Sequence, residues 1–249
     1  MINTFKLWQI VGVVAICLLA TQLSMGAEVG STAEIKKGLA WSFSPDPKLP
    51  NVLILGDSIS IGYTLEVRKR MEGKANIFRP LQRNGIAPYN CGGTARGVKE
   101  IESWLGDTKW SVIHFNWGLH DFKHVSKDGK GSDDASDPVQ TSVEQYSKNL
   151  EEILLKLMAT GAKLIFATTT PVAPGTKGPL REPEAPGKYN VAAIKIMELN
   201  GIKINDLYGF VMPKLKKLQL RRNVHFNQEG SSVLAEKVAE MIEVELGEK

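Results

Sequence analysis

The chain has 249 residues, of which 43% are hydrophobic and 23% are charged, and its formal net charge is +4. This composition excludes a disordered protein, and the absence of any repeat of about 20 to 50 residues excludes a repeat array. The charge is mild and no basic cluster alternates with aromatic residues, so we expect no nucleic-acid partner. A single α/β domain is the class that remains.

Residues 1–27 are predicted to form a secretory signal peptide. Lys6 precedes an apolar stretch over residues 7–20, and small residues follow in SMGA before Glu28. An uncleaved anchor is the alternative, but the apolar stretch is shorter than the ~20 residues that a membrane span needs. We therefore expect a secreted or periplasmic protein that has no membrane contact once the leader is removed.

Removal of the leader takes Cys17 with it and leaves Cys91 as the only cysteine. No internal disulfide is then possible. The flanking sequence YNCGGT offers no partner base for a nucleophile. We interpret Cys91 as a small, semi-buried side chain.

The domain is expected to span residues 51–249, after an irregular segment over residues 28–50 whose prolines forbid a regular helix. Five short apolar runs predict strands, at residues 52–56, 76–80, 111–118, 163–171 and 202–208. The clearest helical patterns lie between and after them, at residues 139–160 with Gly161 as the stop and at residues 228–246 with Asn227 as the cap. Strands that alternate with helices predict a parallel sheet covered on both faces.

Two long polar stretches, residues 121–138 and 171–188, follow predicted strands. Each should emerge at the carboxyl edge of the sheet, where open α/β sheets bind ligands. Loops of this length are usually functional or disordered. We interpret both as rims of a substrate cleft beside Ser58.

The first predicted strand runs directly into Gly56-Asp57-Ser58. A tight strand-to-helix turn at this place would lift the Ser58 hydroxyl above the sheet, as a nucleophile requires. The alternative role for Ser58 is helix capping. The Asp57 carboxylate is expected to support the turn by accepting backbone N–H groups.

Four blocks resemble, in order and spacing, those of the SGNH or GDSL-type hydrolases: GDSIS at 56–60, NCGGT at 90–94, NWGLHD at 116–121 and NVHFNQEG at 223–230. The resemblance implies a flavodoxin-like three-layer sandwich with a five-stranded parallel sheet. It also implies a carboxylic ester hydrolase that needs no cofactor. Many members of this family are secreted carbohydrate O-acetylesterases.

The resemblance assigns Ser58 as the nucleophile and His225 as its base. It supplies the backbone N–H groups of Ser58 and Gly92 as oxyanion donors. The third donor in the family is an asparagine, and here that position is His120. We expect the imidazole of His120 to donate instead, with its tautomer fixed by a neighbouring acceptor.

A metal site is the alternative for His120, with His124 and either His114 or Asp121 as partners. The four-residue spacing of His120 and His124 is meaningful on a helix, and these residues are expected on a loop or strand end. We therefore expect no metal.

The acid of the family triad lies three residues before the base, where this chain has Arg222. A cation there cannot orient or stabilise the imidazole. We expect a main-chain carbonyl near Arg222 or Asn223 to orient His225, with Asp206 and Glu229 as possible acids. The chain is then either a Ser–His dyad enzyme of reduced rate or a member whose catalysis has decayed.

The sequence thus predicts an esterase that removes small O-acyl groups, above all acetyl, from a carbohydrate or another small ester. A lipase or lysophospholipase is less favoured, because the rim loops are polar and offer no apolar lid. A non-catalytic carbohydrate-binding protein and a metal-dependent hydrolase that uses the histidines also stay open. Trp117 is expected either to stack on a sugar or to be a buried aromatic.

Overall fold

The structure is a computed structural model, and it describes residues 40–83 and 85–247. The predicted signal peptide and residues 28–39 of the predicted irregular segment lie outside the described residues. Residues 40–50 contain turns but neither helix nor strand. Among the described helices, none combines the length and the apolar character that crossing a membrane requires.

The centre of the fold is a sheet of five parallel strands in the order β2-β1-β3-β4-β5. The strands are β1 (Asn51–Leu55), β2 (Asn76–Phe78), β3 (Val112–Phe115), β4 (Lys163–Ala167) and β5 (Lys203–Asn205). All five predicted strands are present, and the predicted fold class is confirmed. The predicted run over residues 163–171 leaves the sheet after Ala167 and continues as three threonines.

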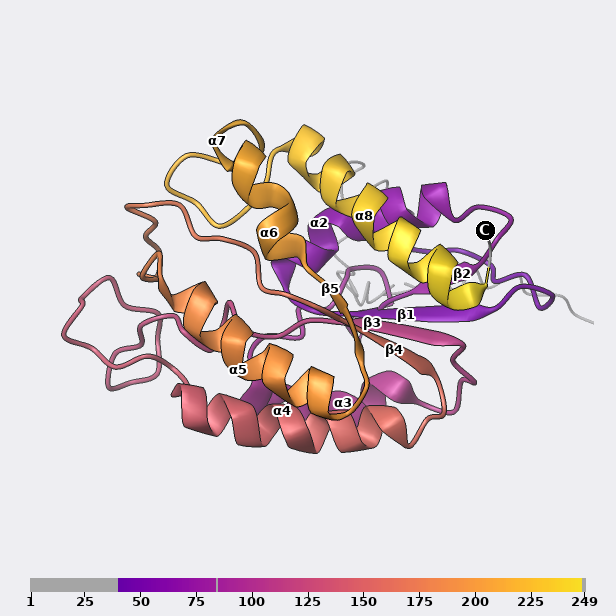
Figure 1. The fold of residues 1–249 in the computed structure, drawn as a ribbon, viewed down its shortest axis with the longest axis horizontal. Helices are drawn as coiled ribbons and strands as arrows, with labels where there is room; N and C mark the ends of the chain where they lie inside the picture. The colour runs from indigo at the N-terminus through magenta and orange to yellow at the C-terminus, as the bar shows by residue number, and fades with distance from the viewer. Residues whose placement is uncertain (1–39, 84, 248–249) are drawn as a thin grey trace, which may run out of the picture.

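Helices cover both faces of the sheet, so the molecule has three layers (Figure 1). One face carries α2 and α8, which pack against each other, and α6, η1 and α7 lie on the same side. The other face carries α3, α4 and α5. The bounds are α2 (Ser58–Arg70), α3 (Thr94–Leu105), α4 (Val143–Met158), α5 (Ala185–Leu199), α6 (Leu207–Val211), η1 (Met212–Lys214), α7 (Leu215–Leu218) and α8 (Gln228–Leu246).

The two helices predicted most clearly are present, and their caps explain their ends. Helix α8 starts as predicted, because the Asn227 side chain accepts the N–H of Gly230. Helix α4 starts at Val143 rather than at residue 139, because Ser142 is the residue whose side chain caps it. Val139 instead forms an isolated bridge with His124.

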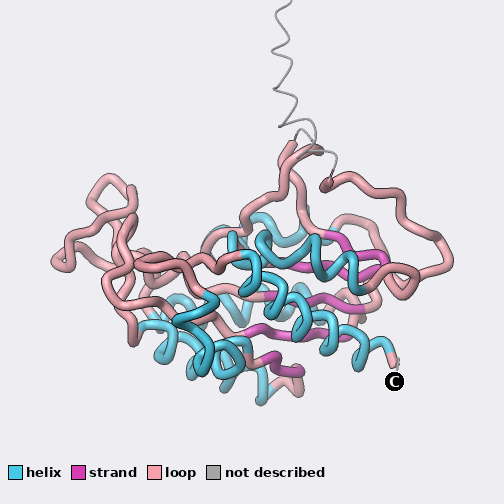
Figure 2. The backbone as a smooth tube through the Cα atoms, turned by 90° about the horizontal axis from the view of Figure 1, so that it is seen from above, coloured by secondary structure: helices cyan, strands magenta, loops and turns pink. Residues whose placement is uncertain are grey.

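The two predicted rim loops lie together at one end of the sheet (Figure 2). The second loop is shorter than predicted, since α5 already begins at Ala185. Backbone hydrogen bonds join the loops: the His124 N–H donates to the Leu180 carbonyl at 3.0 Å, and the Leu180 N–H donates to the Ser132 carbonyl at 2.9 Å. The pair therefore forms one connected wall at the carboxyl edge.

Candidate active site

The turn from β1 into α2 presents Ser58 as the first residue of the helix. Gly56 allows this turn, since a Cβ at that position would lie 3.0 Å from the Oγ of Ser60. Asp57 caps the helix, and its carboxylate accepts the Ile59 N–H at 2.9 Å. The supporting contact expected of Asp57 is therefore present, and it leaves the Ser58 N–H without a hydrogen bond among the described residues.

Ser58 and His225 lie side by side although 167 residues separate them in the chain. The Ser58 Oγ is 2.8 Å from the His225 Nε2. Helix α2 carries the serine, the turn before α8 carries the histidine, and the packing of α2 on α8 brings both to one edge. This is the geometry that a serine nucleophile and its base require.

The other ring nitrogen of His225 contacts the side chain of Asn223. The His225 Nδ1 lies 2.7 Å from the Asn223 Oδ1, and the same oxygen accepts the backbone N–H of His225 at 2.9 Å. Because a backbone N–H can only donate, the amide must turn its oxygen toward the histidine. Nδ1 then carries the proton, and Nε2 is free to accept from Ser58.

The expectation of a main-chain carbonyl near residue 222 or 223 was therefore wrong. The group is the side-chain carbonyl of Asn223, which lies two residues before the histidine. The two alternative acids have other partners: Asp206 caps α6, and Glu229 forms an ion pair with Lys217. Arg222 is exposed, has a φ of 52°, and lies near Gly175.

Gly92 does not offer the free N–H group that was expected of it. Its N–H donates to the Asn90 Oδ1 at 2.9 Å, and its φ is 64°. An oxyanion could take this donor only if the Asn90 amide turned away. The Ser58 N–H is thus the available backbone donor beside the hydroxyl.

His120 lies within electrostatic range of Asp57. Burial lowers its pKa to about 4, an effect that Asp57 opposes. The imidazole is therefore neutral near pH 7 and can donate one N–H. The acceptor expected to fix its tautomer is not found, because neither ring nitrogen is hydrogen-bonded to another described residue.

Asp121 joins the second motif block to the third. Its carboxylate accepts the Thr94 N–H at 2.9 Å and the Thr94 hydroxyl at 2.5 Å. Burial raises the pKa of Asp121 to about 6, against the lowering effect of these bonds. From the sequence, Asp121 was considered only as a metal ligand, so this link was missed.

Arg79 is a buried cation behind the serine turn, and it was not predicted from the sequence. Its guanidinium donates to the Gly56 carbonyl at 3.2 Å, the Ser60 hydroxyl at 3.1 Å, the Thr64 hydroxyl at 2.9 Å and the Tyr89 carbonyl at 3.0 Å. Burial lowers its pKa. In the sequence, Arg79 directly follows the apolar residues Ile77 and Phe78. This position could have indicated a buried arginine, and a buried charged side chain needs several partners.

The alternative metal ligands are not gathered in one place. His114 is buried in β3 with its Nε2 near the Asn205 amide, and the His124 Nδ1 faces the Asp137 carbonyl. No group of three or more potential ligands occurs among the described residues.

Cys91 and Trp117 are both buried. Burial raises the pKa of the Cys91 thiol to about 11, which agrees with a packing role. The side chain of Trp117 is completely buried. Its alternative role as a sugar platform is therefore wrong.

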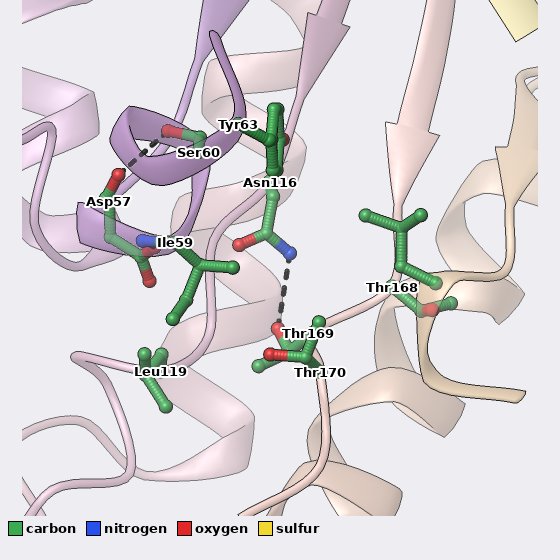
Figure 3. Close-up of a pocket in the computed structure, with 10 residues that line it drawn as sticks. Asp57, Ile59, Ser60, Tyr63, Asn116, Leu119, Thr168, Thr169 and Thr170 are labelled. Carbon is green, nitrogen blue, oxygen red and sulfur yellow. Dashed lines mark hydrogen bonds between the residues drawn. The ribbon is translucent and has the colours of Figure 1, made fainter. Parts of the chain in front are cut away.

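A cavity of about 10 Å³ lies beside the serine turn. Asp57 and Ser60 line it on one side, and the Asn116 amide points across to Thr169, to which it donates at 3.2 Å (Figure 3). A volume of this size suits one water molecule and excludes an acyl chain.

The sequence matches no family model and no curated protein. The structure, however, is similar to an acetyl xylan esterase, AlAXEase, with a TM-score of 0.60 and 15% identity over 77% of this chain and 99% of that one. The chain has the fold of the GDSL-type hydrolases.

Two further structures support this statement. A lipase/acylhydrolase from Enterococcus faecalis has a TM-score of 0.61 and 18% identity over 78% of this chain and 96% of that one. A member of the lipolytic protein G-D-S-L family from Veillonella parvula has a TM-score of 0.54 and 17% identity over 77% of this chain and 97% of that one. In this GDSL-type fold, Ser58 and His225 stand at the carboxyl edge of the sheet, where such folds bind ligands.

Proposed function

We propose that the protein is a serine esterase that cleaves small O-acyl esters, above all acetyl esters, from a carbohydrate. One observation carries the proposal: the Ser58 Oγ lies 2.8 Å from the His225 Nε2, while the His225 Nδ1 lies 2.7 Å from the Asn223 Oδ1. This chain of contacts has a nucleophile, a base and an orienting group in hydrogen-bond reach of one another.

In the first half of the proposed reaction, Ser58 Oγ bonds to the acyl carbon and its proton moves to His225 Nε2. The carbonyl oxygen becomes an oxyanion, which the N–H groups of Ser58 and His120 are proposed to stabilise. The ester C–O bond then breaks, and His225 returns the proton to the leaving alcohol.

In the second half, water attacks the acyl-enzyme. His225 takes the proton of the water and then gives it to Ser58 Oγ as the bond from Oγ to the acyl carbon breaks. The free acid leaves and the serine is restored. The balance of atoms is that of ester hydrolysis.

Asn223 is proposed to act as a positioning residue through His225. It holds the ring in the tautomer that accepts from Ser58, which is half of what a triad carboxylate does. Its amide is neutral and cannot stabilise the imidazolium with a full charge. We therefore expect a working but slow enzyme.

The choice of a small acyl group is supported by the loop over residues 121–138. This loop is polar and offers no apolar lid for the long acyl chain of a lipase substrate. The carbohydrate part of the proposal is supported by the sequence resemblance and by the acetyl xylan esterase of similar structure.

The apolar leader over residues 1–27 supports the further proposal that the protein is secreted or periplasmic.

Hydrolysis of 4-nitrophenyl acetate, butyrate and octanoate by the wild type and by Ser58→Ala tests the proposal. We expect turnover to fall as the chain lengthens, and the variant to lose at least about 10³-fold in kcat. Turnover that survives in Ser58→Ala would overturn the serine mechanism.

A catalytically impaired carbohydrate-binding protein is the second candidate, since no carboxylate contacts His225 among the described residues. Covalent labelling of Ser58 by a fluorophosphonate separates the two. Labelling in the wild type but not in His225→Ala supports the esterase, and absence of labelling in both supports the impaired protein.

A further inference from the structure

Three cationic side chains from different elements lie within electrostatic range of His120. We call Arg96, Lys123 and Arg181 the cationic rim. Arg96 lies in the first turn of α3, whereas Lys123 and Arg181 lie in the two rim loops. All three act electrostatically on His120.

The contacts of Arg96 place its side chain beside the turn that contains Gly92. A Cβ built on Gly92 would lie 3.4 Å from the Arg96 Cδ and 3.5 Å from its Nε and Nη1. The Arg96 Nη1 also donates to the Asn90 carbonyl at 3.3 Å. The guanidinium thus lies across the turn that contains Gly92.

Arg181 lies in the second rim loop, over residues 171–188. Its Nε donates to the carbonyl of Leu119 at 2.7 Å, directly before His120, and its Nη1 donates to Pro179 at 3.2 Å. Only 6% of Arg181 is exposed. Its Nη2 has no hydrogen-bond partner among the described residues, and this atom is accessible to solvent. A charged side chain so deeply placed normally has an anionic partner.

No rim residue has such a partner within residues 40–83 and 85–247. None of the ion pairs among the described residues includes Arg96, Lys123 or Arg181. The carboxylates nearest in electrostatic terms are Asp57 and Asp121, and these are held by the caps and bonds described above. Burial is the main cause that lowers the pKa of Lys123, and the positive charges of Arg181 and Arg96 lower it further. The rim residues therefore repel one another.

Three cations held together without an ion-pair partner are stabilised when an anion binds among them. We propose that the ester substrate carries an anionic group, a carboxylate on its sugar, and that the cationic rim of Arg96, Lys123 and Arg181 binds it. This proposal rests on the proposed esterase function. Because the proposed acyl group is small, the anion belongs to the alcohol part of the ester.

Two acetyl esters that differ in charge test the proposal. 4-Acetoxybenzoate carries a carboxylate on its alcohol part, and methyl 4-acetoxybenzoate is its neutral counterpart. Each kcat/KM is divided by the rate of alkaline hydrolysis of the same ester, which removes the difference in intrinsic reactivity. We expect the wild type to prefer the anionic ester by about tenfold or more, a preference that shrinks at high salt.

Lys123→Gln and Arg96→Gln should each reduce this preference about 3- to 10-fold, and should affect the neutral ester much less. Lys109→Gln is the matched control, because Lys109 is exposed and precedes β3 at the opposite edge of the sheet. It removes the same charge and should change neither rate. A wild type without preference, or a preference that survives in both rim variants, would overturn the proposal.

A binding measurement keeps the rim testable if neither ester is hydrolysed, a result that would refute only the proposed function. Ser58→Ala is titrated calorimetrically with trigalacturonate, with a sulfated trisaccharide and with neutral galactotriose. Binding of the carboxylated sugar alone, lost on adding Lys123→Gln, supports the rim as a carboxylate site. Binding of the sulfated sugar alone would overturn the carboxylate as the bound anion. Equal binding of the neutral sugar, or no binding of any of the three sugars, would overturn the rim as an anion site.

Discussion

At the scale of the residue, the group that distinguishes this site is the amide of Asn223. Its oxygen accepts two hydrogen bonds from His225, so the amide cannot flip without placing its NH₂ against a backbone N–H. The histidine tautomer is therefore correct even without a carboxylate. No carboxylate contacts His225 in the described part of the chain, so the imidazolium of the proposed reaction has no negative charge beside it.

Asn223→Asp should supply that charge and raise kcat for 4-nitrophenyl acetate. In a serine protease, replacing the triad Asp by Asn costs about 10⁴-fold, partly through a wrong tautomer, so we expect a smaller gain here of about 10- to 100-fold. Asn223→Leu should lower kcat instead, because nothing then orients the ring. Arg222→Asp is the control and should give no gain, since Arg222 lies near Gly175 instead. An unchanged kcat in Asn223→Asp would contradict the need for a charge, and an unchanged kcat in Asn223→Leu would contradict the positioning role.

His120 is the second residue whose identity should matter for turnover. If its N–H binds the oxyanion, His120→Ala should lower kcat about 10²- to 10³-fold, as the loss of one such donor does elsewhere. His120→Asn should retain much more activity, because an amide also donates an N–H. Steady-state kinetics on one short ester distinguish the variants, and equal losses in both would remove the donor role.

At the scale of the element, Arg79 ties the turn between β1 and α2 to the loop after β2. It contacts the Gly56 and Tyr89 carbonyls and the hydroxyls of Ser60 and Thr64. The N–H of Cys91 also donates to Gly56, at 3.2 Å, so the first two motif blocks meet at one carbonyl. Arg79 thus fixes the backbone that presents Ser58.

Arg79→Met should destabilise the fold by about 3 kcal/mol, because it leaves several buried acceptors without a donor. For a domain of this size, we expect the Tm to fall by about 6 to 12 °C. Arg83→Met is the matched control, since Arg83 is exposed in the same loop, and it should shift the Tm by less than about 2 °C. Similar Tm values for the two variants, measured by thermal unfolding, would contradict the bracing role of Arg79.

At the scale of the whole molecule, buried histidines couple the free energy of unfolding to pH. Burial lowers the pKa of His114 from 6.5 to about 3 and that of His120 to about 4. Below pH 6.5 these two histidines bind protons in the unfolded chain but stay neutral in the folded chain until the pH approaches their lowered pKa values. Acidification therefore favours the unfolded state, and the stability that these histidines contribute is lost as pH falls through this window.

His114→Phe should flatten this dependence. Between pH 6.5 and pH 4 the wild type should lose on the order of 3 kcal/mol more than the variant, because about 1.4 kcal/mol corresponds to each pH unit in which only the unfolded state is protonated. Urea unfolding at several pH values measures the difference. Parallel curves for the two proteins would show that His114 does not carry the coupling.

Local patterns in the sequence by themselves determined much of this protein. The five apolar runs became the five strands, and the start of α8 lies where Asn227 indicated. These features depend on neighbours in the chain, since burial periodicity and caps act over a few residues. The motif order also placed Ser58 and His225 on the same edge, because parallel strands end on one side of a sheet.

Tertiary structure decided the contacts around that pair. The choice of Asn223 over Arg222 depends on how one turn folds back on His225, and the capture of the Gly92 N–H by Asn90 depends on a side-chain rotamer. The cationic rim depends on the packing of two loops and a helix, which hydrogen bonds join between Arg181 and Leu119 and between Thr94 and Asp121. No periodicity encodes these contacts: the two asparagine contacts are local but depend on side-chain rotamers, and the rim forms only when separate segments meet in space.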